Sequence, residues 1–371
     1  MLASRFDSIL WDLASTGDIP TLIEVASLAS GKPQEHIVAE TLIVADANPL
    51  DVIRPKRNTP IEVLSVGAVG VMKVKDEGGT FTISTWPTAY DGVFHLVGGL
   101  PATDSRWGKV DRWIGKAAPK AVRCFLDHAD FLDIGTALAE HADVEVQRLT
   151  GRMRADRSGY GRSFPALAGD DLRPDPAEIV RQAEGHGAAV RTMHLHVGDV
   201  ANVVIRRQAG ATFVRGDFGV FEHRILNRLA VAAHRRRELM SNRQRVVDEA
   251  PKRPIEVRLS TPMLTDATAT GHVLDELAVA SNRLSYAVLH RNPYLHVSVM
   301  DEDDGSNYGL FVTRPDAIEI HPGFRATLGS LTRLAQVLGD RFEAVSLGEE
   351  PEDRPESFYD LVDSLADGYR G

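Results

Sequence analysis

The chain has 371 residues, of which 43% are hydrophobic and 25% are charged, so it can form the cores of two or three domains. Its single cysteine excludes an internal disulfide framework and fits a reducing cytoplasm. No apolar run approaches the roughly 18 residues that a membrane helix needs, so we expect a cytoplasmic protein without a membrane partner.

The net charge of −10 is unevenly distributed along the chain. The acidic excess lies in residues 301–371, because acidic and basic residues are balanced over the first 300. Within that balanced part, 144–165 and 203–250 are rich in arginine. This pattern favours a localised basic site for phosphate, or a contact between it and the acidic tail, over general affinity for nucleic acid.

Residues 5–46 predict three helices. The first carries one apolar stripe at helical spacing, formed by Phe6, Ile9, Leu10 and Leu13. The stretch VASLASGKPQEHIVAETL, residues 25–42, places a small residue and a glycine-containing turn between two apolar helical patterns. It resembles a helix-turn-helix.

In the next two segments, 61–76 and 78–87, apolar and polar residues alternate, so we expect two strands. The stretch Asp76-Glu77-Gly78-Gly79 would form the hairpin turn between them. Three helices and a hairpin resemble a winged helix-turn-helix domain over residues 1–105. The second helix of the motif would offer Lys32, Gln34 and His36 to DNA, but it also carries Glu35, Glu40 and Asp46. Contact with a protein is therefore as consistent with the resemblance as contact with DNA.

The rest of the chain predicts an α/β middle domain over 106–247, an α+β domain over 254–345 and an acidic tail over 346–371. The expected fold class is therefore a multi-domain α+β and α/β chain. The middle domain combines helices with a strand meander over 190–218. The third domain has helices at 267–283 and 324–342 and an antiparallel sheet, whose strands we expect at 254–260, 283–290, 293–301, 307–313 and 317–322.

The helix predicted over EHRILNRLAVAAHRRREL, 222–239, is the first candidate site. The spacing of Arg228 and His234 resembles the Arg-x(4–6)-His motif of the helical HEPN ribonucleases, although here the helix follows three strands. The alternative is an amphipathic helix on a sheet, whose last-turn arginines suit the helix dipole. A nucleic-acid contact or a partner-facing surface would use Arg235, Arg236, Arg237, Arg243 and Arg245.

The loop GRMRADRSGYGRSF, 151–164, is the second candidate. Arginines for phosphate, an aromatic ring for stacking and glycines for adaptability are the combination found in single-strand binding. The candidate contacts are Arg152, Arg154, Arg157, Tyr160 and Arg162. A surface loop without a ligand is the alternative.

His194 and His196 would face the same side of a strand. With Asp199 they could begin a metal site, but no matching cluster stands out elsewhere, so a packed pair is the preferred interpretation and no metal or cofactor is expected. Cys124 lies in the apolar run VRCFL and is expected to be a buried small hydrophobe.

These observations favour a non-enzymatic bacterial accessory protein that binds a partner protein, with nucleic acid contacted through the two arginine zones. DNA processing, regulation and defence against phage would all suit it. The alternatives are a nuclease built on His194, His196, Arg228 and His234, and a pure protein scaffold. The sequence leaves open whether the chain is an enzyme.

Overall fold

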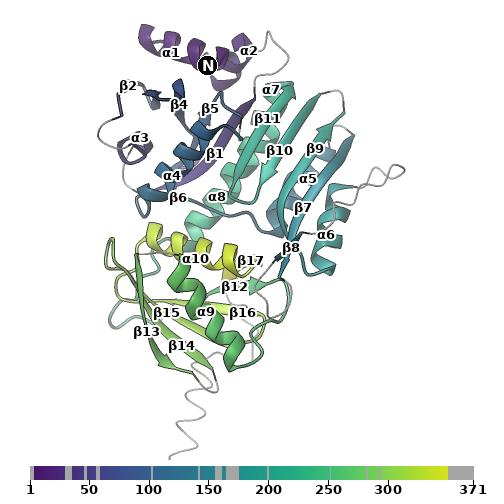
Figure 1. The fold of residues 1–371 in the computed structure, drawn as a ribbon. Coiled ribbons are helices and arrows are strands. Elements are labelled where there is room, and N and C mark those ends of the chain that lie inside the picture. Colours follow the sequence, from purple (N-terminus) through teal and green to yellow (C-terminus); the bar gives the residue numbers. More distant parts are fainter. Residues whose placement is uncertain are drawn as a thin grey trace, which may run out of the picture. The chain divides into compact units, whose positions relative to one another are not determined.

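A computed structural model describes residues 4–29, 36–45, 48–55, 59–101, 103–140, 143–154, 161–163, 175–198, 200–250, 252–280, 283–291 and 294–349. The chain divides into two compact units (Figure 1). The first comprises Met1–Asn242 and Thr327–Gln336, and the second comprises Arg243–Ala326 and Val337–Gly371. Each mixes helices with an antiparallel sheet, which confirms the multi-domain α+β expectation.

The first unit is built on an 11-stranded sheet with the order β2-β3-β4-β5-β1-β11-β10-β9-β7-β8, in which β6 pairs with β1. Its strands are β1 (Ile37–Val44), β2 (Ile61–Val66), β3 (Val69–Asp76), β4 (Gly79–Pro87), β5 (Val93–Gly98), β6 (Ala121–Arg123), β7 (Val144–Arg154), β8 (Gly161–Ser163), β9 (Ala189–Val197), β10 (Ala201–Arg206) and β11 (Gly210–Gly216). Its helices are α1 (Arg5–Thr16), α2 (Leu22–Ala29), α3 (Pro49–Val52), α4 (Ser105–Ala117), α5 (His128–Ala139), α6 (Pro176–Gly185), α7 (Phe218–Val220), the π-helix η1 (Phe221–Leu226) and α8 (Asn227–Met240).

Strand β1 corrects the helix-turn-helix expectation. The stretch that was to form its second helix is instead a strand from Ile37, and all eight of its residues are buried. It pairs with β5 on one side and with β11 on the other. Glu40, expected on an exposed recognition helix, is buried and contacts Arg123 and Arg206. The winged-helix interpretation is therefore wrong for this segment.

Because β1 joins β5 to β11, strands from residues 37–98 and 121–216 share one sheet. The expected boundary between 1–105 and 106–247 thus falls within a single sheet. The hairpin prediction was partly right: the turn at Asp76–Gly79 joins β3 to β4, but 61–76 forms two strands, β2 and β3. Gly67, with φ of 58°, lies in the turn between them.

The described residues of the first unit form two hydrophobic cores. In the larger, apolar residues of α1, α2, α5, α6 and α8 pack with sheet residues such as Ala39 and Val97. The smaller lies between α4 and the β1–β5 half of the sheet, and includes Trp107, Trp113 and Phe81. The amphipathic pattern of α4 thus holds it on the sheet by one face and leaves its other face for polar contacts.

Helix α1 is anchored by a buried carboxylate. Ser4 caps its first turn by accepting a hydrogen bond from the Asp7 amide. Asp7 accepts hydrogen bonds from the amide of Thr82, at 3.0 Å, and from the amide of Gly99, at 2.9 Å. The helix is therefore tied to β4 and to the end of β5 by polar as well as apolar contacts.

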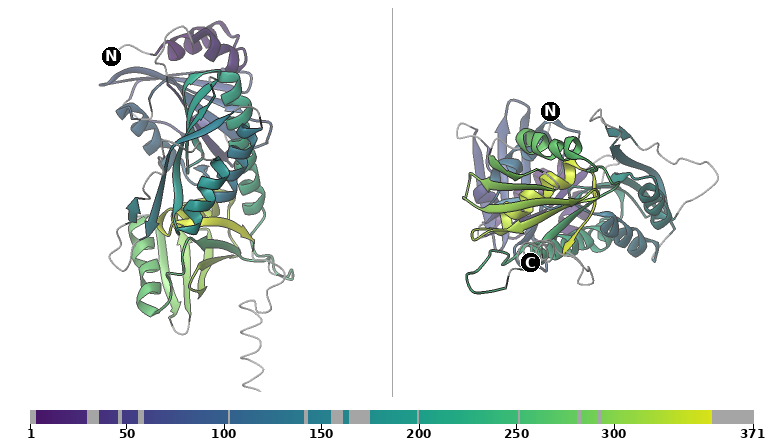
Figure 2. Two further views of the ribbon diagram at one scale, coloured as in Figure 1. Left: turned by 90° about the vertical axis from the view of Figure 1, so that its right-hand side faces the viewer. Right: turned by 90° about the horizontal axis from the view of Figure 1, so that it is seen from below.

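Five strands were expected within residues 254–345, and the second unit has a strand at each of those positions. Its sheet has the order β13-β14-β15-β16-β12-β17, and Figure 2 shows helix α9 on one face of it. The elements are β12 (Ile255–Leu259), α9 (Ala267–Ala280), β13 (Leu284–His290), β14 (Leu295–Asp301), β15 (Asn307–Arg314), β16 (Ala317–Pro322) and β17 (Ala344–Glu349). Helix α10 (Leu328–Arg341) is divided between the units: residues 328–336 belong to the first and residues 337–341 to the second. Strand β17 was not expected. It takes up residues 346–349 of the predicted acidic tail, and the rest of that tail lies outside the described residues.

Candidate functional site

The arginines of α8 do not form an open basic patch. The Arg236 side chain is only 8% exposed, and its Nη2 donates to Asp127 Oδ2 at 2.7 Å and to Asp130 Oδ2 at 2.8 Å. These two aspartates form the capping box of α5, so Arg236 joins the start of α5 to α8. It is a structural ion pair inside the first unit.

The neighbouring arginines are paired as well. Arg235 and Arg228 lie 3.4 and 3.3 Å from the carboxylate of Asp133. Arg237 lies 3.8 Å from Asp91 and 3.5 Å from Glu238. Carboxylates therefore offset much of the positive charge that the sequence places on this helix.

The electrostatics of the α5 capping box follow from burial and from Arg236. Burial raises the pKa of Asp130 to about 6, although Arg236 acts in the opposite direction. Burial also acts to raise the pKa of Asp127, but Arg236 and the Asp130 amide outweigh it and lower that pKa. The two carboxyl groups thus differ: the pKa of Asp127 is held below its ordinary value, and that of Asp130 is raised to about 6.

Arg228 and His234 do not meet. Arg228 is directed to Asp133 of α5, whereas the His234 ring stacks on Tyr90, in the loop between β4 and β5, with centroids 4.4 Å apart. The two residues whose spacing resembles the ribonuclease motif therefore hold α8 against two different elements.

Arg243 and Arg245 belong to the second unit. Arg243 is buried, forms an ion pair with Glu349 of β17 and donates to the carbonyl oxygen of Arg253. The Arg245 guanidinium lies over the Phe324 ring, 5.4 Å from its centroid. Both side chains thus make contacts within their own unit.

The loop candidate is described only in part. Arg152 is exposed near the end of β7. Arg154 and Arg162 lie in the paired strands β7 and β8, where the register sets Arg154 opposite Gly161 and Arg162 opposite Met153. Arg157 and Tyr160 lie outside the described residues, so this part of the prediction stays a prediction.

His194 and His196 share one side of β9, as the strand pattern indicated, since both alternate with buried residues. The His196 Nδ1 atom hydrogen-bonds to the side-chain amide of Asn202. Burial, with a contribution from Arg148, lowers the pKa of His194. In the part of the chain that the structure describes, no group of three His, Cys, Asp or Glu residues is arranged to hold a metal ion.

A cavity of about 770 Å³ beside α4 is the site that the sequence did not single out. Helix α4 begins after its N-cap, Asp104, whose side chain accepts a hydrogen bond from the Arg106 amide. Four of its residues line the cavity at i, i+3, i+4 and i+7, and so share one face of the helix. The lining residues are Thr59, Pro60, Lys75, Asp76, Glu77, Lys109, Arg112, Trp113 and Lys116.

The opposite wall comes from the β3–β4 turn. Asp76 Oδ1 accepts a hydrogen bond from the Gly78 amide at 2.7 Å, which shapes the turn, and Asp76 Oδ2 accepts one from Lys109 Nζ at 2.5 Å. The Lys109 side chain is 33% exposed and that of Asp76 is 11% exposed. This half-buried ion pair links α4 to the turn across one end of the cavity.

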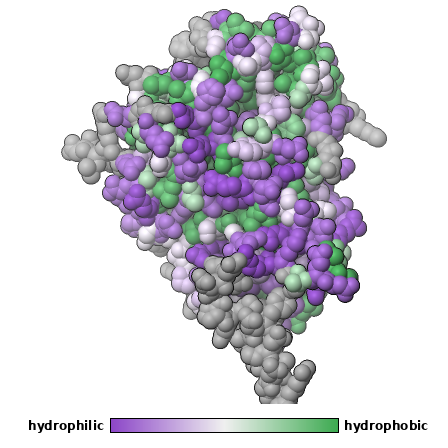
Figure 3. Space-filling view, turned by 180° about the vertical axis from the view of Figure 1, so that it is seen from behind, coloured by the Kyte–Doolittle hydropathy of each residue, from purple (hydrophilic) through white to green (hydrophobic). Residues whose placement is uncertain are grey.

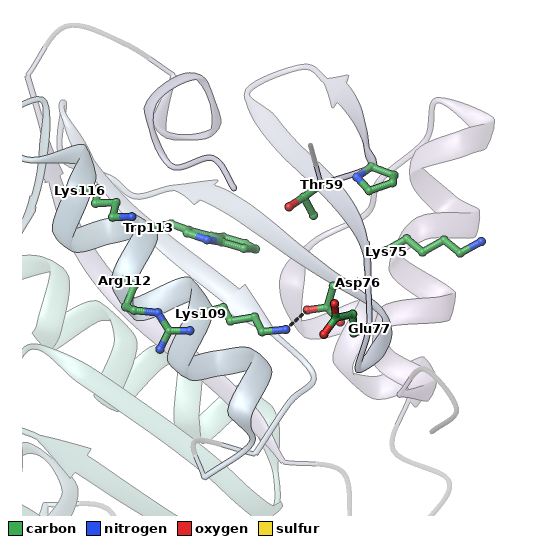
Figure 4. Close-up of a pocket in the computed structure, with 9 residues that line it drawn as sticks. Thr59, Lys75, Asp76, Glu77, Lys109, Arg112, Trp113 and Lys116 are labelled. Atoms are coloured by element: carbon green, nitrogen blue, oxygen red, sulfur yellow. Dashed lines mark hydrogen bonds and ion pairs between the residues drawn. The ribbon is translucent and has the colours of Figure 1, made fainter. Parts of the chain in front are cut away.

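Trp113 projects from α4 between Lys109 and Lys116, whereas the Arg112 side chain is directed away from the indole (Figure 4). Its ring stacks on Phe81, with centroids 6.1 Å apart and planes inclined by 17°. The indole is thereby fixed by the core and contributes an aromatic wall to the cavity.

Arg112 and Lys116 supply positive charge that the described residues do not compensate. Both are exposed, and neither has an ion pair or side-chain hydrogen bond to any residue that the structure describes. Lys75 runs away from Trp113, and Glu77 lies by the turn (Figure 4). The α4 wall is therefore cationic and the turn wall carries the carboxylates.

A helical wheel of residues 105–117 would have revealed this site, since it places Lys109, Arg112 and Lys116 on one face with Trp113. Counts of charge over long windows overlook it, because Asp104 and Asp111 dilute the same stretch. The opposite wall, by contrast, depends on the pairing of β3 with β4 and on the packing of α4.

Comparisons with known proteins give no further guide: no family model and no curated protein matches the chain. None of the helices in the described part of the chain is long and apolar enough to cross a bilayer. The face opposite the view of Figure 1 is dominated by hydrophilic side chains, with apolar ones scattered among them (Figure 3).

Proposed function

We propose that this protein binds a phosphate-bearing ligand in the α4 cavity and performs no chemistry of its own. The observation that carries the proposal is the uncompensated pair Arg112 and Lys116 beside Trp113, in a cavity of about 770 Å³. Cavities of this size are typical for small ligands and cofactors. We infer binding from the cavity's charge and shape.

Phosphate fits the cationic wall better than a single carboxylate does. Guanidinium groups bind phosphate oxygens through two parallel hydrogen bonds, and a neighbouring lysine adds a mobile point charge. Arg112 and Lys116 are four residues apart on α4, so rotation of the two exposed side chains can bring both to one phosphate or to two adjacent ones. The indole adds a surface against which a base can pack.

The wider role that we propose is that of a cytoplasmic bacterial accessory protein with a protein partner and a nucleic-acid or nucleotide ligand. DNA processing, regulation or phage defence would suit it. Arg152 could extend a nucleic-acid contact, whereas the paired arginines of α8 would contribute little to it. The nuclease alternative draws on Arg228 and the histidines of β9 and α8, which have separate partners.

The test is fluorescence anisotropy with a short labelled single-stranded oligonucleotide over a salt series. In the double variant Arg112→Gln/Lys116→Gln we expect weaker binding and a salt slope lower by about 1 to 2, since each phosphate contact releases counterions. The matched control is Arg181→Gln/Lys120→Gln, which removes the same charge from exposed positions outside the cavity lining. Equal binding by the two double variants would contradict the proposal.

A further inference from the structure

We infer that the phosphate-bearing ligand of the α4 cavity is an extended phosphorylated segment of a partner protein, which adds a strand to the free edge of β2. Its phosphate is bound by Arg112 and Lys116. The inference rests on the proposed function and makes the phosphate-bearing ligand and the protein partner one molecule. It joins two features of the first unit: an unpaired strand edge, and a cationic helix face across the cavity at which that edge begins.

Strand β2 leaves half of its backbone groups without a partner in the described part of the chain. It lies at one end of the 11-stranded sheet and, among the described strands, pairs only with β3 (Figure 1). The Lys75 amide donates to the carbonyl oxygen of Pro60, so the even-numbered residues of β2 bond to β3 and the odd-numbered ones face away from it. The N–H and C=O groups of Ile61, Val63 and Ser65 therefore point to the open side of the sheet.

This edge is poorly protected against the addition of a strand. The Val63 side chain is apolar and 40% exposed. The register with β3 is unbroken, and Glu62 is the only charged residue in the six residues of β2. Prolines, bulges and several charges are the usual protection of a free edge. An edge of this length without them can pair with an extended peptide.

The free edge begins at the α4 cavity. Thr59 and Pro60 line the cavity and directly precede Ile61, the first residue with outward backbone groups. The Ile61 side chain packs on the smaller core, between α4 and the sheet, so every second side chain of an added strand also lies on the α4 side. Helix α4 lies across the cavity from Thr59 (Figure 4). A phosphorylated side chain at this end of the peptide can thus reach the exposed Arg112 and Lys116.

A phosphopeptide fits these features better than a nucleic acid does. Pairing with β2 requires amide donors and carbonyl acceptors that alternate at strand spacing, which a peptide backbone has and a sugar–phosphate backbone lacks. Phosphoserine carries a charge of about −1.5 to −2 at pH 7, which matches the two cations. An aspartate or glutamate side chain would leave one of these cations uncompensated.

The experiment is fluorescence anisotropy of the full chain with a labelled heptapeptide that has phosphoserine at its centre, valine two positions to either side and threonine elsewhere. The phosphoserine and the valines then share the side of the added strand that faces α4. We expect the unphosphorylated peptide to bind at least about tenfold more weakly, because it loses the charge-assisted hydrogen bonds.

Two N-methylated versions of the phosphopeptide test the strand pairing, one methylated at the odd-numbered amides and the other at the even-numbered ones. Methyl groups on the amides that face β2 should weaken binding by about tenfold or more, since two or three backbone hydrogen bonds are lost. Methyl groups on the other amides should change the affinity by less than about twofold, because those amides do not face β2.

Two variants separate the strand edge from the cations. Val63→Pro removes an outward amide, a change that edge strands tolerate, and should weaken peptide binding several-fold while pyrophosphate affinity, measured by calorimetry, is kept. Val63→Ala is the matched control, since it keeps the amide. Arg112→Gln/Lys116→Gln should weaken the binding of both ligands. Circular dichroism verifies that each variant is folded, and the methylated peptides test the pairing on the wild-type protein.

The outcomes distinguish failure of this inference from failure of the proposed function. Equal affinity for the two methylated peptides, or peptide binding that Arg112→Gln/Lys116→Gln leaves unchanged, would overturn the inference, whereas pyrophosphate binding would keep the phosphate site. Binding of the labelled oligonucleotide but not of the phosphopeptide would assign the cavity to a nucleic acid and also overturn the inference. Absence of binding by any of the phosphate ligands would overturn both.

Discussion

Nη2 of Arg236 lies 2.7 Å from Oδ2 of Asp127, in the interior of the first unit. An arginine from the most basic stretch of the sequence is thus a buried link between α8 and the N-terminus of α5. The same nitrogen also donates to Asp130. Arg236 therefore neutralises two carboxylates that the fold has largely removed from water.

Replacement of Arg236 by alanine should lower the free energy of unfolding by about 3–5 kcal/mol, since it leaves buried carboxylates without their partner. Arg235→Ala is the control, because the Arg235 side chain is 48% exposed and its ion pairs should contribute less than about 1 kcal/mol. Urea unfolding of both variants provides the measurement. Similar losses in the two would show that the Arg236 pair is not structural.

The ion-pair partners of Arg236 could not be predicted from the sequence. Its partners lie 109 and 106 residues earlier in the chain, and nothing local to α8 identifies them. Amphipathicity did predict the helix itself, because that pattern is local. The charge balance of a site depends instead on contacts between distant elements, so counts of arginine overstated the basic surface here.

Strand β1 was mispredicted for a related reason. Its sequence, IVAETLIV, is buried on both faces at the centre of the sheet, so it lacks the alternation of a half-exposed strand. A short apolar run of this kind cannot be distinguished from a buried helix by periodicity. Strands β13–β16 of the second unit were predicted correctly because their alternation is clear and turn residues separate them.

Asp7 should make the stability of the fold depend on pH. Burial raises its pKa from 3.8 to about 6, although the amides of Thr82 and Gly99 act against this. A carboxyl whose folded pKa is raised stabilises the fold below its unfolded pKa, and this contribution is lost as pH rises through the folded value. Between pH 4 and 7 the loss should be about 2.4 kcal/mol.

The comparison that isolates this effect is wild type against Asp7→Asn, by urea unfolding at pH 4, 5, 6 and 7. Asp130, also raised to about 6, adds to the pH dependence in both proteins and cancels in the difference. Asp12→Asn is the control, since Asp12 is exposed on the same helix. If the free energy of unfolding of Asp7→Asn fell with pH as steeply as that of the wild type, Asp7 would not be the source of the pH dependence.

Gly210 should tolerate no larger residue. A Cβ atom there would lie 2.6 Å from Oε1 of the buried Glu40 and 2.9 Å from Nη2 of Arg206. Gly210→Ala must displace this ion pair, so we expect a loss of about 1–3 kcal/mol in thermal or urea unfolding. Gly115→Ala is the contrasting variant: nothing lies within 4 Å of its added Cβ, and alanine should stabilise α4 by up to about 1 kcal/mol. A loss of stability in both would point to a general effect of the substitution.

Asp76 should limit the anion affinity of the α4 cavity by holding Lys109. Asp76→Asn keeps an oxygen for the Gly78 amide, so the turn is retained, but it removes the charge that pairs with Lys109 Nζ. The released ammonium should strengthen pyrophosphate binding by roughly three- to tenfold, the range expected for about 1 kcal/mol from a partly exposed charge.

Asp111→Asn is the control, because it removes the same charge from α4 at a position that pairs with Arg123 and does not line the cavity. Calorimetry with pyrophosphate therefore measures what Lys109 contributes. An equal gain in both variants would reflect net charge alone, and no gain in Asp76→Asn would mean that the cavity does not bind the anion beside α4.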